Sequence, residues 1–288
     1  MHESGELYPS AAAGGRRIFR RKFSPRAGEV RGGMLMLHGW GDHLGCHVVA
    51  AEMFCGQGWV AAGVDWPGHG FSEGRRGQVA GGVAGLLDLV GEALAWLKDA
   101  VGEDLPLGLY AHSTGGLLAL RFLTQQGMVG DSTLFDRVWL SSPLLRPRHG
   151  QHWLKIAGAR LVARWFPEAI LDTGVRPAKC RHVDAAKAKA AGDYDLCHHF
   201  ISVSMGAELL AAGDRLADAA PPLGDPVRVL ITQGLEDGIC PPAFSHAFFE
   251  KIPARDKLYV PLPGLRHETL REPGNELLIE AVEAWLGA

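Results

Sequence analysis

Residues Leu107–Leu118 read LGLYAHSTGGLL, and this stretch decides the fold. An apolar run typical of a strand ends in A-H-S-T-G, and a segment typical of a helix follows at once. This is the setting of a nucleophile elbow, a turn so tight that the residues two before and two after the serine must be small. Ala111 and Gly115 meet that requirement. The pattern predicts a strained Ser113 with its hydroxyl exposed at the end of the strand, whereas an N-capping serine is the simpler alternative.

Short apolar runs bounded by glycine alternate with amphipathic segments along the rest of the chain. Such alternation is typical of an α/β fold, a mostly parallel sheet flanked by helices. Strands are predicted at 17–23, 34–38, 60–65, 105–111, 137–141, 227–233 and 257–261, and helices at 79–101, 113–126, 242–251 and 273–286.

One connection, residues 143–220, is far longer than the alternation needs, since one helix and loops of about 2 to 6 residues would be enough. Its sequence predicts helices at 153–166, 183–191 and 195–212. We therefore expect an inserted helical cap, or lid (143–220), on an α/β core formed by 1–142 and 221–288. Long insertions at the carboxyl edge of a sheet usually serve the site at that edge, although a surface decoration without a role is the alternative.

A serine nucleophile needs a base, and the base needs an acid that orients it. With a nucleophile elbow these residues follow in the order serine, acid, histidine, in loops after later strands. Asp237 follows the strand at 227–233, and His267 follows the strand at 257–261. The sequence therefore predicts a catalytic triad of Ser113, Asp237 and His267. Glu236 is the rival acid, and the alternative for His267 is a surface position at the entry to a helix.

Backbone N–H groups must stabilise the oxyanion that forms when the serine attacks a carbonyl. One donor is expected from Thr114, directly after the nucleophile. The other is expected from Trp40 in HGWGDH (38–43), where Gly39 and Gly41 let the chain turn close to the substrate. Trp40 is also expected to border the substrate pocket.

Nearby histidines are assigned other roles. His112, beside the serine, is expected to line the substrate pocket, and His38 is interpreted as structural. The loop DWPGHGFSEG (65–74) is expected to brace the elbow through His69 and Ser72. We assign this loop no chemistry.

No metal and no cofactor are expected. His43 and His47 are spaced like ligands on one helix face, but no third ligand is evident from the sequence. Cys197-His198-His199 is interpreted as packing or surface. The five cysteines have no C-x-x-C pair or regular spacing, which is typical of free thiols in a reducing cytoplasm.

Composition excludes several classes of protein. The chain has 288 residues, 47% of them hydrophobic, with a formal net charge of −3, so nucleic acid is not an expected partner. The basic N-terminal stretch lacks the apolar region of a secretory signal, and no apolar run reaches the roughly 18 residues of a membrane span. We expect a cytoplasmic protein, with peripheral contact at the inner membrane surface as a further hypothesis. The sequence leaves the oligomeric state open.

The motifs HGWGDH, DWPGHGFSEG, AHSTGG, SSPLL, QGLEDGICP and GLRHETLRE, in this order, resemble those of the α/β-hydrolase superfamily. Within it they are similar to the monoacylglycerol lipase and lysophospholipase group, which is also grouped with serine aminopeptidases. The resemblance covers about 16–142 and 221–288 and implies the same triad and the same oxyanion donors. Three positions depart from the family pattern: Ala111 replaces glycine, Asp42 replaces glutamate and Trp40 replaces a smaller residue.

The favoured hypothesis is a cofactor-independent serine hydrolase that cleaves carboxylic esters of lipid-like substrates, monoacylglycerols or lysophospholipids, through an acyl-enzyme. An esterase or thioesterase for small or aromatic acyl groups, or an aminopeptidase, is the alternative among enzymes. Outside enzymes, the alternative is a ligand-binding module with a vestigial triad.

The cap segment HWLKIAGARLVARWF (152–166) decides whether a lipid surface is a further partner. Basic residues lie between apolar ones that recur at near-helical spacing: Trp153, Ile156, Ala157, Leu161 and Trp165. The apolar stripe either packs on the core or lines the mouth of an acyl tunnel and dips into a membrane interface.

Overall fold

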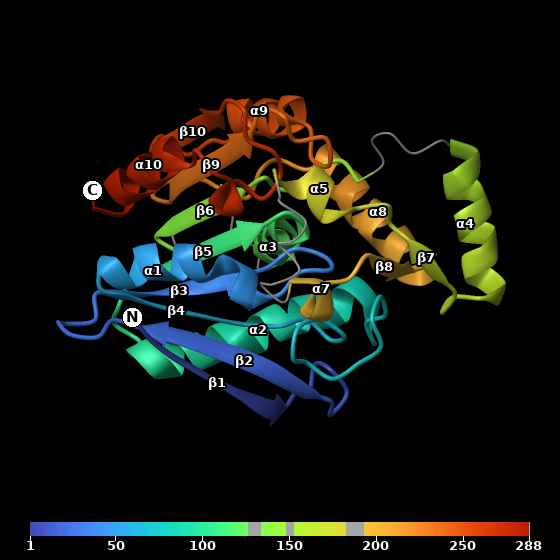
Figure 1. Cartoon of the computed structure of the whole chain (residues 1–288), viewed down its shortest axis with the longest axis horizontal. Coiled ribbons are helices and arrows are strands. Elements are labelled where there is room, and N and C mark those ends of the chain that lie inside the picture. Colours follow the sequence, from blue (N-terminus) through green and yellow to red (C-terminus); the bar gives the residue numbers. More distant parts are fainter. Residues whose placement is uncertain (126–133, 148–152, 183–192, 288) are drawn as a thin grey trace.

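An eight-stranded sheet forms the centre of the computed structural model, which describes residues 1–125, 134–147, 153–182 and 193–287 (Figure 1). In spatial order its strands are β1 (His2–Pro9), β2 (Arg17–Ser24), β4 (Trp59–Val64), β3 (Gly32–Leu37), β5 (Leu107–His112), β6 (Arg137–Ser141), β9 (Arg228–Gly234) and β10 (Lys257–Leu262). The pairs β1–β2 and β2–β4 are antiparallel, and every other pair is parallel. This confirms the predicted mostly parallel sheet and all seven predicted strands.

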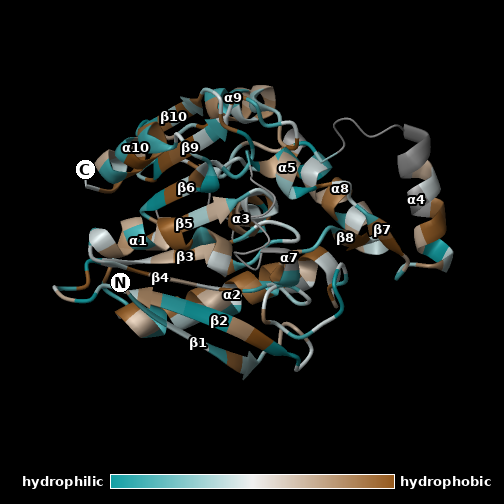
Figure 2. Cartoon of the chain, in the orientation of Figure 1, coloured by the Kyte–Doolittle hydropathy of each residue, from teal (hydrophilic) through white to brown (hydrophobic). Residues whose placement is uncertain are grey.

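The strand β1 was not predicted, because HESGELYP has no apolar alternation. Seven of its eight residues are exposed, and it pairs with β2 at the edge of the sheet. Much of β2 is hydrophilic as well, as Figure 2 shows. An edge hairpin of this kind is held by backbone pairing and by surface charges. Neither interaction requires apolar residues at alternate positions, so the sequence shows no strand periodicity.

Helices cover both faces of the sheet because side chains of the inner strands alternate between them. Leu35 and Leu37 of β3 join the cluster that contains α2 (Gly82–Val101) and α3 (Thr114–Gln125). Met34 and Met36 join the opposite cluster. That second cluster contains α1 (Val48–Gly56) and α10 (Glu276–Gly287), while α9 (Pro242–Lys251) packs against the first. The helix α1 was not predicted, because VVAAEMFCG is almost uniformly apolar and shows no amphipathic period.

The parallel strands all end at one edge of the sheet, where the loops that follow them meet. The loop after β3 begins at His38, the turn after β5 is Ser113, and the loops after β9 and β10 contain Asp237 and His267. Loops from four strands that are distant in sequence therefore come together at this edge.

Residues 143–220 rise above this edge as a set of short elements, and they are not wholly helical. They contain α4 (Trp153–Trp165), β7 (Ile170–Asp172), α5 (Pro177–Cys180), α7 (Asp193–Leu196), β8 (Phe200–Ser202) and α8 (Val203–Asp218). The predicted helix at 195–212 is wrong at 197–202, between α7 and α8. There β8 pairs with β7, and Ser202 then caps α8 by accepting the N–H of Met205 at 3.2 Å. The predicted helix at 183–191 lies outside the described residues.

The helices α8 and α4 differ in how they meet the rest of the protein. Met205, Leu209 and Leu216 form a buried stripe that seats α8 on the first core cluster. In α4, at the margin of the molecule in Figure 1, Leu161 is 65% and Trp165 72% exposed. The interpretation that the apolar stripe of 152–166 packs on the core is therefore wrong for these two residues. Figure 2 shows hydrophobic residues, in brown, on α4. The side chains of Trp153 and Ile156 lie outside those described.

None of the helices in the described part of the chain is both long enough and apolar enough to cross a lipid bilayer.

We expect Leu216→Ala to lower the free energy of unfolding by about 2–5 kcal/mol, because it leaves a cavity between α8 and the core. The matched change Leu161→Ala on exposed α4 should cost less than about 0.5 kcal/mol. Urea denaturation of both variants measures the difference. Equal losses would contradict the seating of α8 on the core.

Candidate active site

Ser113 occupies the sharp turn between β5 and α3. Its φ of +53° is in the left-handed region, which costs free energy for a residue with a side chain. The turn is tightly packed: a Cβ at Gly115 would lie 2.4 Å from the carbonyl oxygen of Leu37, and one at Gly116 2.8 Å from Pro143. Only glycine fits at these two positions. The strained serine that the sequence predicts is therefore present, and its Oγ bonds to a histidine instead of capping α3.

Ser113, His267 and Asp237 form a buried hydrogen-bonded chain. The Nε2 atom of His267 lies 2.9 Å from Ser113 Oγ, and its Nδ1 lies 2.7 Å from Asp237 Oδ2. In neutral His267, Nδ1 therefore donates to the carboxylate and Nε2 accepts from the serine hydroxyl. The structure thus brings together the three residues that the sequence singles out, from the loops after β5, β9 and β10.

The Asp237 carboxylate is held by further donors. The backbone N–H groups of Ile239 and Cys240 each donate to its Oδ1 at 2.8 Å, and Gln233 Nε2 donates to its Oδ2 at 3.0 Å. These bonds replace lost hydration and fix the carboxylate in orientation. Glu236, the rival acid, is half exposed and faces His182 instead. Neither Gln233 nor the two N–H groups were predicted: backbone donors leave no residue-type signal, and Gln233 lies within the apolar strand β9.

Two opposing effects act on the pKa of His267. Burial disfavours the imidazolium, but the charge of Asp237 and its hydrogen bond outweigh burial, so the pKa lies above the ordinary 6.5. His112 packs against it, with ring centroids 4.9 Å apart, and burial lowers the pKa of His112 well below 6.5. His112 therefore stays neutral and places no second positive charge beside His267.

The loop that begins at His38 runs directly against the serine. A Cβ at Gly39 would lie 3.2 Å from Ser113 Cβ, and one at Gly41 2.0 Å from the carbonyl oxygen of His198. The Trp40 indole donates to the carbonyl of Phe200 at 2.8 Å. The loop is thus held between Ser113 and residues 198–200.

His38 has the structural role that the sequence suggests. It is fully buried, accepts the backbone N–H of Trp66 at 3.0 Å and donates to the carbonyl of Gly39 at 2.8 Å. The expectation that His69 and Ser72 brace the elbow is wrong. Ser72 joins its own loop to β2 through Phe19, and His69 packs against Trp40. Both residues lie in the loop after β4, and β3 separates β4 from β5, the strand that leads into the turn at Ser113.

A pocket of about 410 Å³ opens above Ser113. Trp40, His112, Thr114 and His267 line it at the serine end, so both predicted pocket residues are there. Most of its remaining apolar lining comes from residues after 143, among them Leu144, Leu171, Val175, Ile201, Val203 and Leu210. Their sequence pattern does not distinguish a pocket wall from core packing, so the sequence analysis did not find them.

A buried polar network under the pocket was also missed. Asp42 Oδ2 lies 2.6 Å from His47 Nε2, and His47 Nδ1 lies 2.9 Å from the hydroxyl of Tyr110 on β5. Burial opposes ionisation of Asp42, but the adjacent His47 outweighs it and holds the pKa of Asp42 well below 3.8. Both ring nitrogens of His47 are thus engaged in this network.

Residues 180–182 hold the loop that carries His267. The backbone N–H of Glu268 donates to the carbonyl of Cys180 at 2.8 Å, and Arg181 pairs with the Glu268 carboxylate. The backbone N–H of His182 donates to Glu272 at 2.8 Å. This segment therefore helps to position His267.

Among the described residues, two groups have the composition and closeness of metal ligands. The first, Asp237, Cys240 and His267, is already occupied by the hydrogen-bonded chain to Ser113. The second is His43, Cys46 and Cys197, which lies beside the pocket and outside that chain.

Comparison with known proteins covers nearly the whole chain. The sequence model of the family described as serine aminopeptidase, S33, matches residues 28–274. Monoglyceride lipase of Rattus norvegicus is 28% identical over 281 residues, which cover 95% of this chain and 88% of that protein. The crystal structure of Paleococcus ferrophilus monoacylglycerol lipase matches with a TM-score of 0.78 and 26% identity, covering 93% of this chain and 98% of that one. These likenesses confirm the predicted fold class.

A third relative is much longer than this chain. An uncharacterized abhydrolase domain-containing protein of Dictyostelium discoideum is 25% identical over 252 residues, which cover 87% of this chain but only 26% of that protein.

We expect Asp237→Asn to lower the pKa of His267 below the ordinary 6.5, because burial then acts without the carboxylate that opposes it. Glu236→Gln, one residue away, should leave the pKa where it is. NMR titration of the imidazole nitrogens measures both variants against the unaltered protein. A similar shift in the two would mean that Asp237 does not set the state of His267.

Proposed function

Since this chain belongs to the serine aminopeptidase, S33, family and is a lipase- or esterase-type α/β-hydrolase, we propose that it cleaves carboxylic esters of lipid-like substrates through an acyl-enzyme. The observation that carries the proposal is the chain Ser113–His267–Asp237 at one end of a large, mostly apolar pocket. Monoacylglycerols and lysophospholipids are the proposed substrates.

His267 acts first as a general base. It takes the proton of Ser113 through Nε2 as Oγ attacks the ester carbonyl, and then gives it to the leaving alcohol. Water, deprotonated by the same nitrogen, releases the acid from the acyl-enzyme. Asp237 holds the tautomer of His267 and stabilises the imidazolium. Because the base must be neutral, activity falls as the pH drops through the raised pKa of His267.

The backbone N–H groups of Thr114 and Trp40 are the proposed oxyanion donors. Thr114 begins α3, so its N–H also lies at the positive end of the helix dipole. Trp40 is held by its indole bond to Phe200, which fixes the backbone of its loop beside Ser113. Two fixed donors stabilise the charge that develops on the carbonyl oxygen.

The pocket supports a long acyl chain as the substrate group. Its volume of about 410 Å³ lies within the usual range for ligand sites, about 300–1,000 Å³. Aliphatic side chains after residue 143 supply much of its wall, and Arg146 and Asp172 add charged groups. We therefore propose that residues 143–220 form a lid that selects the substrate over the core of 1–142 and 221–288.

A hydrolysis panel tests this function. We expect long-chain p-nitrophenyl esters and monoacylglycerols or lysophospholipids to be cleaved, and Ser113→Ala to lose at least about 10³-fold in kcat. Glu236→Gln serves as the control and should keep most of the activity, since its half-exposed carboxylate lies beside His182 and outside the chain to Ser113. Cleavage of short esters alone would favour the small-acyl esterase, cleavage of amides the aminopeptidase, and no turnover the binding module.

The open apolar surface of α4 further supports contact with a lipid interface. Leu161, Val162, Trp165 and Phe166 are exposed together there, with Arg164 among them. Aromatic side chains favour the headgroup region, and a basic residue near an anionic surface contributes about 1 kcal/mol. We propose that the lid contacts the substrate-bearing surface through this patch.

The double change Trp165→Ser with Phe166→Ser should reduce hydrolysis of a long-chain monoacylglycerol in anionic vesicles about tenfold. Hydrolysis of soluble p-nitrophenyl butyrate should stay within about twofold, because the patch is not part of the pocket wall. Leu277→Ser, at another exposed apolar position, on α10, is the control and should change neither rate. Parallel loss on both substrates would remove the lipid-contact role.

A further inference from the structure

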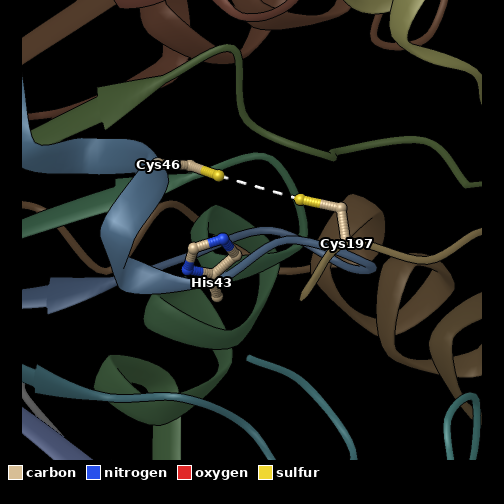
Figure 3. A group of neighbouring side chains, drawn as sticks. All are labelled: His43, Cys46 and Cys197. Atoms are coloured by element: carbon tan, nitrogen blue, oxygen red, sulfur yellow. Dashed lines mark hydrogen bonds between the residues drawn. The ribbon is translucent and has the colours of Figure 1, made fainter. Parts of the chain in front are cut away.

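Two cysteines distant in sequence meet beside the pocket, with a histidine next to them. Cys46 lies in the short 3-10 helix Leu44–His47 of the core, and Cys197 follows α7 of the lid. Their Sγ atoms are 3.8 Å apart, and Figure 3 shows them pointing toward each other with the His43 ring nearby. Cys46 is buried, whereas Cys197 is half-buried.

The hydrogen bonds fix the state of His43. Its Nδ1 accepts the backbone N–H of Gly45 at 3.1 Å and so caps the 3-10 helix. The proton of the neutral imidazole is therefore on Nε2, and the ring is a donor on that side. His43 and the Cys46 thiol can both donate to a Cys197 thiolate.

The two thiols consequently differ in acidity. Hydrogen bonding from Cys46 and then from His43 lowers the pKa of Cys197 to about 7, against burial. The same bond to Cys197, together with burial, raises the pKa of Cys46 well above 9. Near neutral pH, Cys197 is thus the nucleophile and Cys46 the proton donor beside it.

A transition-metal site is the other use of such a group, since two thiolates on a tetrahedral Zn²⁺ stand about 3.8 Å apart. If a metal were bound to Nε2, the imidazole proton would have to be on Nδ1. Nδ1 could then no longer accept the hydrogen bond from the N–H of Gly45. A metal on Nδ1 would displace that N–H. Either position breaks the cap of the 3-10 helix, so the contacts favour thiol chemistry over metal binding.

We propose that Cys197 is a peroxide-reactive thiol and that Cys46 resolves it, forming a disulfide between lid and core. The Cys197 thiolate attacks a hydroperoxide, the O–O bond breaks, and a sulfenic acid and a hydroxide or alkoxide form. The Cys46 sulfur then attacks the sulfenic sulfur and water leaves. The two thiols lose two electrons and two protons in total, and the peroxide is reduced to water and, for an organic peroxide, an alcohol.

The disulfide would fasten residues 197–200 to the loop that holds Trp40. These segments already touch, since His198 N–H donates to the carbonyl of Gly41 at 2.8 Å and the Trp40 indole donates to Phe200. Forming the disulfide requires the two sulfur atoms to close from 3.8 Å to about 2.05 Å.

Peptide mapping after brief exposure of the folded chain to hydrogen peroxide tests the proposal without any activity assay. We expect one Cys46–Cys197 crosslink, reversed by a dithiol, and three of the five thiols left free. Cys46→Ser should stop at a sulfenic acid on Cys197 that dimedone traps. Cys55→Ser, a change of another buried thiol, should still crosslink.

A second variant tests the role of the histidine. Asn also caps helices, so His43→Asn keeps the bond to Gly45 but removes the imidazole donor. Alkylation of Cys197 by iodoacetamide at pH 7 should become several-fold slower, because the pKa of Cys197 rises when one of its two donors is lost. An unchanged rate, first oxidation at another cysteine, or one zinc ion per chain that protects both thiols would each overturn the proposal.

Discussion

The tight turn at Ser113 is the constraint on which the rest of the site depends. A residue with positive φ at the end of a central strand is retained only where the surroundings hold it there. Gly115 and Gly116 let α3 approach the carbonyl of Leu37 and Pro143, and Gly39 lets the neighbouring loop reach the serine. In this position the Ser113 hydroxyl meets His267, which comes from the loop after β10.

Burying an acid–base chain is costly, and the structure offsets this cost with fixed donors. Asp237 receives hydrogen bonds from two backbone N–H groups, from Gln233 and from His267. Burial keeps His112 neutral, so His112 adds no positive charge beside His267, whereas Asp237 favours the imidazolium. Preorganised dipoles of this kind do not have to reorient during the reaction, which is how a buried site can favour charge separation.

Much of the core could be predicted from sequence, because periodicity and turn chemistry are local. The strand, tight turn and helix around Ser113 and the loops with Asp237 and His267 follow from short motifs. The segment 143–220 could not be predicted in the same way. Its ribbon β7–β8 consists of three-residue strands that are too short to show a period, and pocket residues such as Leu171 and Ile201 have the sequence character of core. The contact of Cys46 with Cys197 spans 151 positions and depends on how this segment folds back.

We propose above that the buried chain makes Ser113 a nucleophile that carries the acyl group. Rapid acid quench of the protein during turnover of a p-nitrophenyl ester, followed by peptide mass analysis, can detect that acyl group. We expect an acyl adduct on the peptide that contains Ser113, formed in a burst no larger than one per chain. Turnover with no adduct, or with the acyl group on Cys240 beside the serine, would contradict it.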